Sequence, residues 1–143
     1  MKKYPLSQSQ LGVFLECCMH PEDTQYNFPF CAELDKNESA QVIADAWKNL
    51  IEHFDIFRAR FMIDDKNNFL QWTDKEMPVN IPIKCMSETE AQNYIRKDFI
   101  KPFAILSGEP LFRIEFIETE KKLYMLVDFH HLIMDAFSLS NIT

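Results

Sequence analysis

Glycine is scarce in this chain of 143 residues. Only Gly12 and Gly108 are present, where an average usage of about 7% would give about ten. A P-loop and a G-x-G-x-x-G dinucleotide-binding turn both need closely spaced glycines, because their backbone must approach a phosphate closely. The G-x-S-x-G turn of serine hydrolases has a similar requirement. The sequence therefore excludes these three motifs.

Basic residues and long apolar runs are also lacking. The chain has 15 Lys and Arg against 22 Asp and Glu, a net charge of −7, whereas a nucleic-acid binder usually carries a basic patch. No uncharged apolar run approaches the roughly 20 residues of a membrane helix. The apolar stretch 11–15 is too short for the core of a signal peptide, which needs about 7–15 residues. We therefore expect no nucleic-acid partner, no membrane span and a cytoplasmic location.

The cysteines lack the spacing of a metal site. Cys17, Cys18, Cys31 and Cys85 form no C-x-x-C pair, and a zinc site needs closer pairs of ligands. Adjacent cysteines such as Cys17 and Cys18 are poorly placed to bond to each other. In the absence of a secretion signal, we predict four reduced and mostly buried thiols.

Apolar types make up 47% of the chain and charged types 26%, which is typical of one soluble domain. Apolar spacing predicts helices from Ser7 to Met19, from Asn37 or Ser39 to about His53, and from a capping box at Ser87 and Glu90 through Phe99. Alternation predicts extended segments or strands at 26–34, 56–63, 69–72, 79–85, 111–118 and 123–129. Helices that alternate with strands indicate an α/β or α+β fold.

His130, His131 and Asp135 form the only dense cluster of reactive groups. If the alternation of the preceding strand continues, His131 lies on the apolar face of Leu123 to Phe129 and His130 lies on the other face. An apolar wall keeps a histidine neutral, so that it can accept a proton as a general base. A buried structural histidine and a metal ligand are the alternatives, although opposite directions disfavour a shared ion. The spacing alone does not choose among these three interpretations.

Four segments resemble one family, in its order. Residues 130–136, H-H-L-I-M-D-A, resemble the H-H-x-x-x-D-G motif of the condensation domains of nonribosomal peptide synthetases. Residues 6–10 resemble the family's S-x-A-Q motif. Residues 55–61, D-I-F-R-A-R-F, resemble its H-E-x-L-R-T-x-F segment, and residues 101–113 resemble its P-F-D-L-x-x-x-P-L-F-R segment. The resemblance extends over the whole chain.

The resemblance implies a two-layer sandwich of helices and a mixed, mostly antiparallel sheet, as in chloramphenicol acetyltransferase. It also implies that residues 1–143 are the N-terminal lobe of a two-lobed domain whose second lobe is absent, so that this piece alone is inactive. Such domains form an amide bond between donor and acceptor thioesters held on the phosphopantetheine arms of carrier proteins. We expect no cofactor or metal bound by the lobe itself.

The resemblance assigns roles residue by residue. His131 is the catalytic residue, His130 shapes the site, and Asp135 is structural, with Arg58 as one candidate partner. Ala136 departs from the family's glycine. Ester formation or acyl transfer from CoA is an alternative reaction within the same superfamily. The departure at Ala136 favours a second alternative, a degenerate module that only docks carrier proteins. An exposed lobe interface further predicts a dimer or aggregate.

Overall fold

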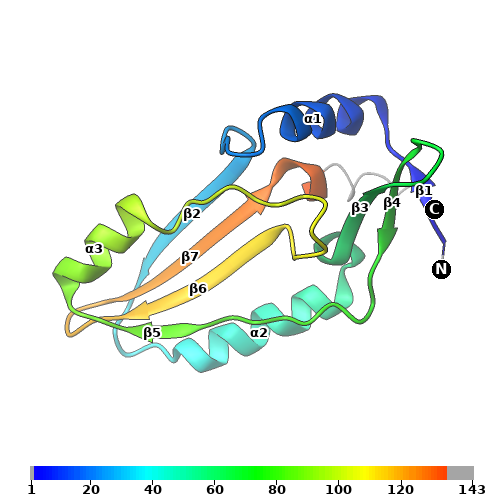
Figure 1. The fold of residues 1–143 in the computed structure, drawn as a ribbon. Helices are drawn as coiled ribbons and strands as arrows, with labels where there is room; N and C mark the ends of the chain where they lie inside the picture. The colour runs from blue at the N-terminus through cyan, green and yellow to red at the C-terminus, as the bar shows by residue number, and fades with distance from the viewer. Residues whose placement is uncertain (1, 135–143) are drawn as a thin grey trace.

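The fold is built on two sheets, as shown by a computed structural model that describes residues 2–134 (Figure 1). The smaller sheet has the order β1-β4-β3 and is antiparallel, with β1 at Tyr4–Pro5, β4 at Phe69–Thr73 and β3 at Ala59–Ile63. The larger sheet has the order β2-β7-β6-β5, with β2 at Asn27–Leu34, β7 at Leu123–His130, β6 at Phe112–Glu118 and β5 at Ile83–Cys85. Only the β5–β6 pair is parallel. The expected mixed, mostly antiparallel α+β architecture is confirmed.

Three α-helices begin at serine N-caps. They are α1 at Gln8–Met19, α2 at Ala40–His53 and α3 at Glu88–Lys97, and their caps are Ser7, Ser39 and Ser87. At α1, the Ser7 hydroxyl accepts the Gln10 backbone N–H at 3.1 Å, and the Gln10 side chain accepts the Ser7 N–H at 2.9 Å. The buried Gln10 amide also pairs with Gln71 of β4. This capping box therefore fastens α1 to the smaller sheet.

Helices α2 and α3 pack against opposite faces of the larger sheet. On one face, Trp47 of α2 lies against Phe129 and donates to the Met125 sulfur. On the other face, Ala91 of α3 packs with Tyr124 and Leu126. Strand β7 is thus covered on both sides, which explains the nearly continuous apolar character of residues 123–129. The sequence pattern alone indicated only one apolar face for this strand.

The segment predicted as a strand from residue 56 to 63 begins with a helical turn. Residues Asp55–Arg58 form a 3-10 helix, η1, and the strand β3 starts only at Ala59. The Phe57 N–H donates to the Phe54 carbonyl, and the Arg58 guanidinium reaches back to the Glu52 carbonyl near the end of α2. These hydrogen bonds give partners to the backbone groups of Phe54, Phe57 and Glu52, which favours a helical turn over an extended segment here.

Other boundaries also differ from the sequence-based expectation. The predicted strand 79–85 is reduced to β5, because Pro82 has no backbone N–H to donate to the ladder. Its carbonyl accepts the Phe116 N–H just before β5 begins. Helix α3 ends at Lys97, two residues before Phe99.

All four thiols are free, as predicted, but the expectation that they are mostly buried is wrong. Cys17 is half-buried, whereas Cys18, Cys31 and Cys85 are exposed. Cys31 lies on the edge strand β2 and Cys85 ends β5, positions that the sequence alone does not identify as solvent-facing. Within residues 2–134, none of the helices has the length and apolar character that a bilayer crossing requires.

Candidate active site

The two adjacent histidines stand where β7 ends. His130 is the last residue of the strand, and a helical turn starts at His131. The His130 N–H donates to the Leu111 carbonyl on the β6 side, and the His131 N–H donates to the Tyr26 carbonyl on the β2 side, both at 2.9 Å. Both neighbouring strands therefore hold this end of β7, and the strand's alternation sends the two imidazoles to opposite faces.

His130 is enclosed, with an exposed fraction of 3%. Its Nδ1 accepts the Leu132 backbone N–H at 3.1 Å, and its Nε2 lies 3.4 Å from the Cys17 Sγ of α1. The Phe103 ring packs edge-on against the imidazole at a centroid distance of 5.8 Å. Burial, helped by the nearby His131, lowers the pKa of His130 to about 4. The His130 imidazole is therefore neutral at physiological pH.

His131 is only partly buried. Its ring lies 5.5 Å from the Phe28 ring and 6.1 Å from the Tyr26 ring, by centroid distance. Phe28 and Phe30 of β2 are themselves 46% and 56% exposed. Tyr26 and Phe28 therefore form an aromatic rim beside His131, at the edge of the larger sheet.

The sequence correctly predicted the faces of the two imidazoles, because Phe28 pairs with Phe129 in register and so marks the face of His131. The sequence was wrong about which of the two imidazoles is enclosed. The enclosed imidazole, which burial keeps neutral, is His130, whereas His131 is only partly buried. The physical reason is that both faces of β7 are covered, and Phe103 and α1 close over the His130 side.

Arg58 borders this site through η1. Its neighbour Phe57 packs at 5.8 Å against both Phe112 and Phe129, next to the end of β7. The Arg58 guanidinium donates to the Glu52 carbonyl and to the Asp55 carboxylate. Its Nε is buried and has no hydrogen-bond partner among residues 2–134.

Two of the predicted site residues, Asp135 and Ala136, lie outside the described residues. The pairing of Arg58 with Asp135 therefore stays a prediction, as do the effect of Ala136 and the roles of His130 and His131.

A polar cluster that the sequence analysis missed lies on the His130 side. Asp128 is fully buried, and its Oδ2 accepts from the Asn27 side chain at 2.8 Å. Asn27 also donates to the Lys101 carbonyl at 2.9 Å. Burial raises the pKa of Asp128, while the Asn27 hydrogen bond and the Arg113 charge oppose that rise. The cluster joins β2 and β7 to the segment that carries Phe103.

Arg113 of β6 completes this cluster. Its guanidinium donates to the carbonyls of Lys101 and Pro102 at 2.8 and 2.7 Å. It also lies 3.9 Å above the centroid of the Phe103 ring, a cation–π contact. We call residues 98–110 the strap; Arg113 and Asn27 hold the strap so that Phe103 covers His130. The sequence did carry one signal for this cluster. Arg113 and Asp128 are polar residues that face each other in a largely apolar hairpin.

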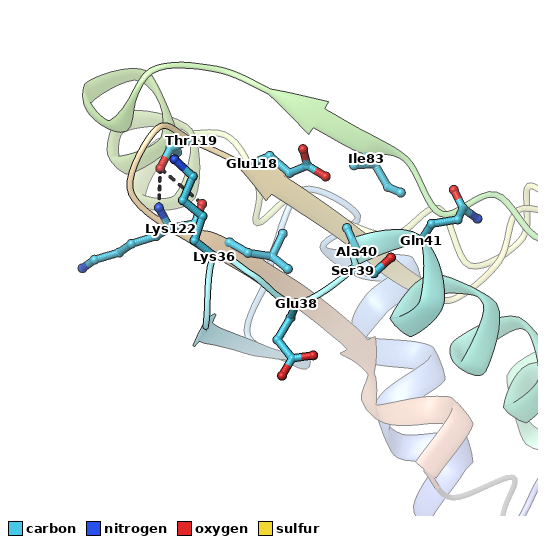
Figure 2. A pocket seen from close by; sticks show the side chains of 10 residues that line it. Lys36, Glu38, Ser39, Ala40, Gln41, Ile83, Glu118, Thr119 and Lys122 are labelled. Carbon is cyan, nitrogen blue, oxygen red and sulfur yellow. Dashed lines mark hydrogen bonds between the residues drawn. The ribbon is translucent and has the colours of Figure 1, made fainter.

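Residues 2–134 contain no group of three or more His, Cys, Asp or Glu side chains that could hold a metal ion. A pocket of about 390 Å³ lies beside the first turn of α2, lined by residues that include Lys36, Ser39 and Lys122 (Figure 2). This pocket reaches Leu123 at the start of β7, whereas the two histidines lie at the opposite end of β7. It is therefore separate from the histidine site.

Comparisons with known proteins point to one family. A family model described as the condensation domain matches residues 1–143. One of the plipastatin synthase proteins of Bacillus subtilis (strain 168) is 30% identical over 138 residues, covering 96% of this chain and 5% of that protein. Bacitracin synthase 2 of Bacillus licheniformis is 29% identical over 137 residues, covering 95% and 5%.

A solved structure has the same fold. The crystal structure of the starter condensation domain of rhizomide synthetase superposes with a TM-score of 0.80 at 20% sequence identity, covering 92% of this chain and 34% of that one. The chain thus spans about a third of that structure and only a small part of the curated relatives.

Proposed function

Because the chain belongs to the condensation domain family, we propose that it is part of a nonribosomal peptide synthetase domain that forms amide bonds. The acceptor is the amine of an aminoacyl thioester, and the donor is an acyl or peptidyl thioester. The amine nitrogen attacks the donor carbonyl carbon, a tetrahedral intermediate forms, and the carbon–sulfur bond then breaks. The amine loses a proton and the departing thiolate gains one, so the reaction needs a group that can carry or position that proton.

We assign this role to His131, and one observation carries the assignment: the two adjacent imidazoles differ in burial. His130 is 3% exposed, and both of its ring nitrogens are engaged, by Leu132 and by Cys17. His131 is partly exposed beside the aromatic rim of Tyr26 and Phe28. This difference in burial supports His131, and not the enclosed His130, as the group that meets a substrate, either as a general base or by orienting the amine and stabilising the intermediate.

The domain that we propose is larger than this chain. The chain corresponds to about a third of a solved condensation domain structure, and we infer that it forms the N-terminal lobe, while a second lobe supplies the opposite wall of the site. Much of the acceleration of a two-substrate reaction comes from holding both reactants in place. We therefore expect the chain without the second lobe to be inactive. Carrier proteins with phosphopantetheine arms are the proposed partners, and the cytoplasm is the proposed location.

The test uses the complete synthetase domain that contains this chain. Two carrier proteins are loaded with donor and acceptor thioesters, and product is followed by mass spectrometry. His131→Ala should lower the product rate by about 100-fold or more, the usual scale of a general base. His20→Ala is the matched control, because His20 is an exposed histidine at the end of α1, and it should keep the wild-type rate.

Two results would contradict the proposal. Unchanged turnover in His131→Ala would remove the assigned role of His131. Absence of amide product from the wild type, across several substrate pairs, would favour ester formation, transfer from CoA, or carrier docking without catalysis.

A further inference from the structure

The contact between Cys17 and His130 joins two elements that are 113 positions apart in the sequence. The Cys17 Sγ lies 3.4 Å from the His130 Nε2, and the His130 Nδ1 accepts the Leu132 N–H. A neutral imidazole carries its proton on one nitrogen and accepts with the other. Since Nδ1 is the acceptor, the proton must be on Nε2, where it points toward the Cys17 sulfur.

We propose that Cys17 is a positioning residue for the histidine pair: its sulfur accepts the Nε2–H of His130 and holds that imidazole in one tautomer and one orientation. The fixed ring in turn holds the Leu132 N–H, which lies in the helical turn that starts at His131. Cys17 thereby links helix α1 to the backbone that presents His131. Its effect on catalysis rests on the proposed function, whereas its effect on the tautomer does not.

The same two atoms could suggest a nucleophilic cysteine–histidine pair, but the charges argue against it. Burial, with added repulsion from Cys18, Glu16 and Asp23, raises the pKa of the Cys17 thiol to about 11. The pKa of His130 is lowered to about 4. A reactive pair needs a thiolate and an imidazolium, and both shifts disfavour those forms. Cys17 and His130 are therefore a neutral pair that packs and orients.

Imidazole nitrogen NMR on the full chain, labelled with 15N in histidine, tests the contact directly. The expected spectrum of His130 shows a proton on Nε2, none on Nδ1, and no change of tautomer between pH 8 and pH 5. Cys17→Val keeps a side chain of similar size but removes the acceptor, and should speed exchange of the Nε2–H with water by about tenfold. Cys17→Ser supplies a hydroxyl acceptor and should restore slow exchange.

Cys18→Val is the matched control, because Cys18 is the exposed neighbour on the same helix. A proton on Nδ1 of the wild-type His130 would overturn the proposal without any variant. Equal exchange rates in Cys17→Val and Cys18→Val would also overturn it.

A second measurement separates this proposal from the proposed function. In the complete domain, Cys17→Val should lower kcat several-fold with little change in KM, and Cys17→Ser should recover most of the loss. If the wild-type domain makes no amide product, the proposed function fails, while the NMR result still decides the role of Cys17. Normal exchange behaviour in Cys17→Val together with a lowered kcat would contradict positioning through His130.

Discussion

The two adjacent histidines at the end of β7 have opposite surroundings. On one side, α1 and the strap enclose His130, so that Cys17 and Phe103 touch its ring. On the other side, the edge strand β2 leaves Phe28 half-exposed beside His131. Burial encloses the first imidazole, whereas the second is only partly buried, as the proposed role of His131 requires.

The enclosed side should make stability depend on pH through His130. Its pKa is about 4 in the folded chain against an ordinary 6.5, so between these pH values the unfolded chain binds a proton that the folded chain does not. The unfolding free energy should therefore fall as the pH drops from 6.5 toward 4. At roughly 1.4 kcal/mol per pKa unit, this loss is on the order of 3 kcal/mol.

Urea unfolding at a series of pH values measures that loss. His130→Gln retains an amide that can bond to Leu132 and Cys17 but does not titrate, so its stability should depend less on pH than that of the wild type. His20→Gln, at an exposed position, should follow the wild type. Parallel curves for the wild type and His130→Gln would mean that His130 is not buried as described.

The strap should loosen when Arg113 is removed. Arg113→Ala loses two hydrogen bonds to the carbonyls of Lys101 and Pro102 and the contact above the Phe103 ring. We expect a loss of about 2 kcal/mol of unfolding free energy and faster proteolysis within residues 98–110. Arg113→Lys keeps the charge but not the forked geometry, and should be intermediate. A change below about 0.5 kcal/mol in Arg113→Ala would show that the strap is held by other contacts.

The exposed side should tolerate substitution. Phe30 is 56% exposed on the edge strand β2, and Phe30→Thr should change the unfolding free energy by no more than about 0.5 kcal/mol. The same substitution should weaken the self-association expected from the sequence, because Phe28 and Phe30 expose aromatic surface together. Sedimentation velocity over a range of concentrations measures this effect.

Val42→Thr is the control for this experiment, since Val42 is an exposed apolar residue on α2 rather than on β2. Equal association of Phe30→Thr and Val42→Thr would exclude the β2 edge as the contact surface. A fully monomeric wild type would contradict the predicted dimer itself.

Local patterns in the sequence were sufficient for much of the fold. The serine caps at Ser7, Ser39 and Ser87 and the β6–β7 hairpin follow from neighbouring residues, and the structure confirms them. The start of β3 was wrong, because hydrogen bonds from Arg58 and Phe57 to the end of α2 outweigh an alternating pattern.

The contacts that distinguish the two histidines could not be predicted in this way. Cys17 meets His130, and Asn27 meets both Asp128 and Lys101, across long stretches of chain. No local periodicity encodes such pairs. The sequence could assign each histidine to a face, but the choice of the buried face depended on where α1 and the strap lie.

Carbethoxylation of the folded chain by diethyl pyrocarbonate tests the division between the two histidines most directly. The reagent attacks accessible neutral imidazoles, and mass spectrometry with His130→Gln and His131→Gln variants assigns the modified ring. We predict that His131 reacts in the folded chain, while His130 reacts only after urea unfolding. Comparable rates at both rings, or protection of His131 and reaction of His130, would contradict the account.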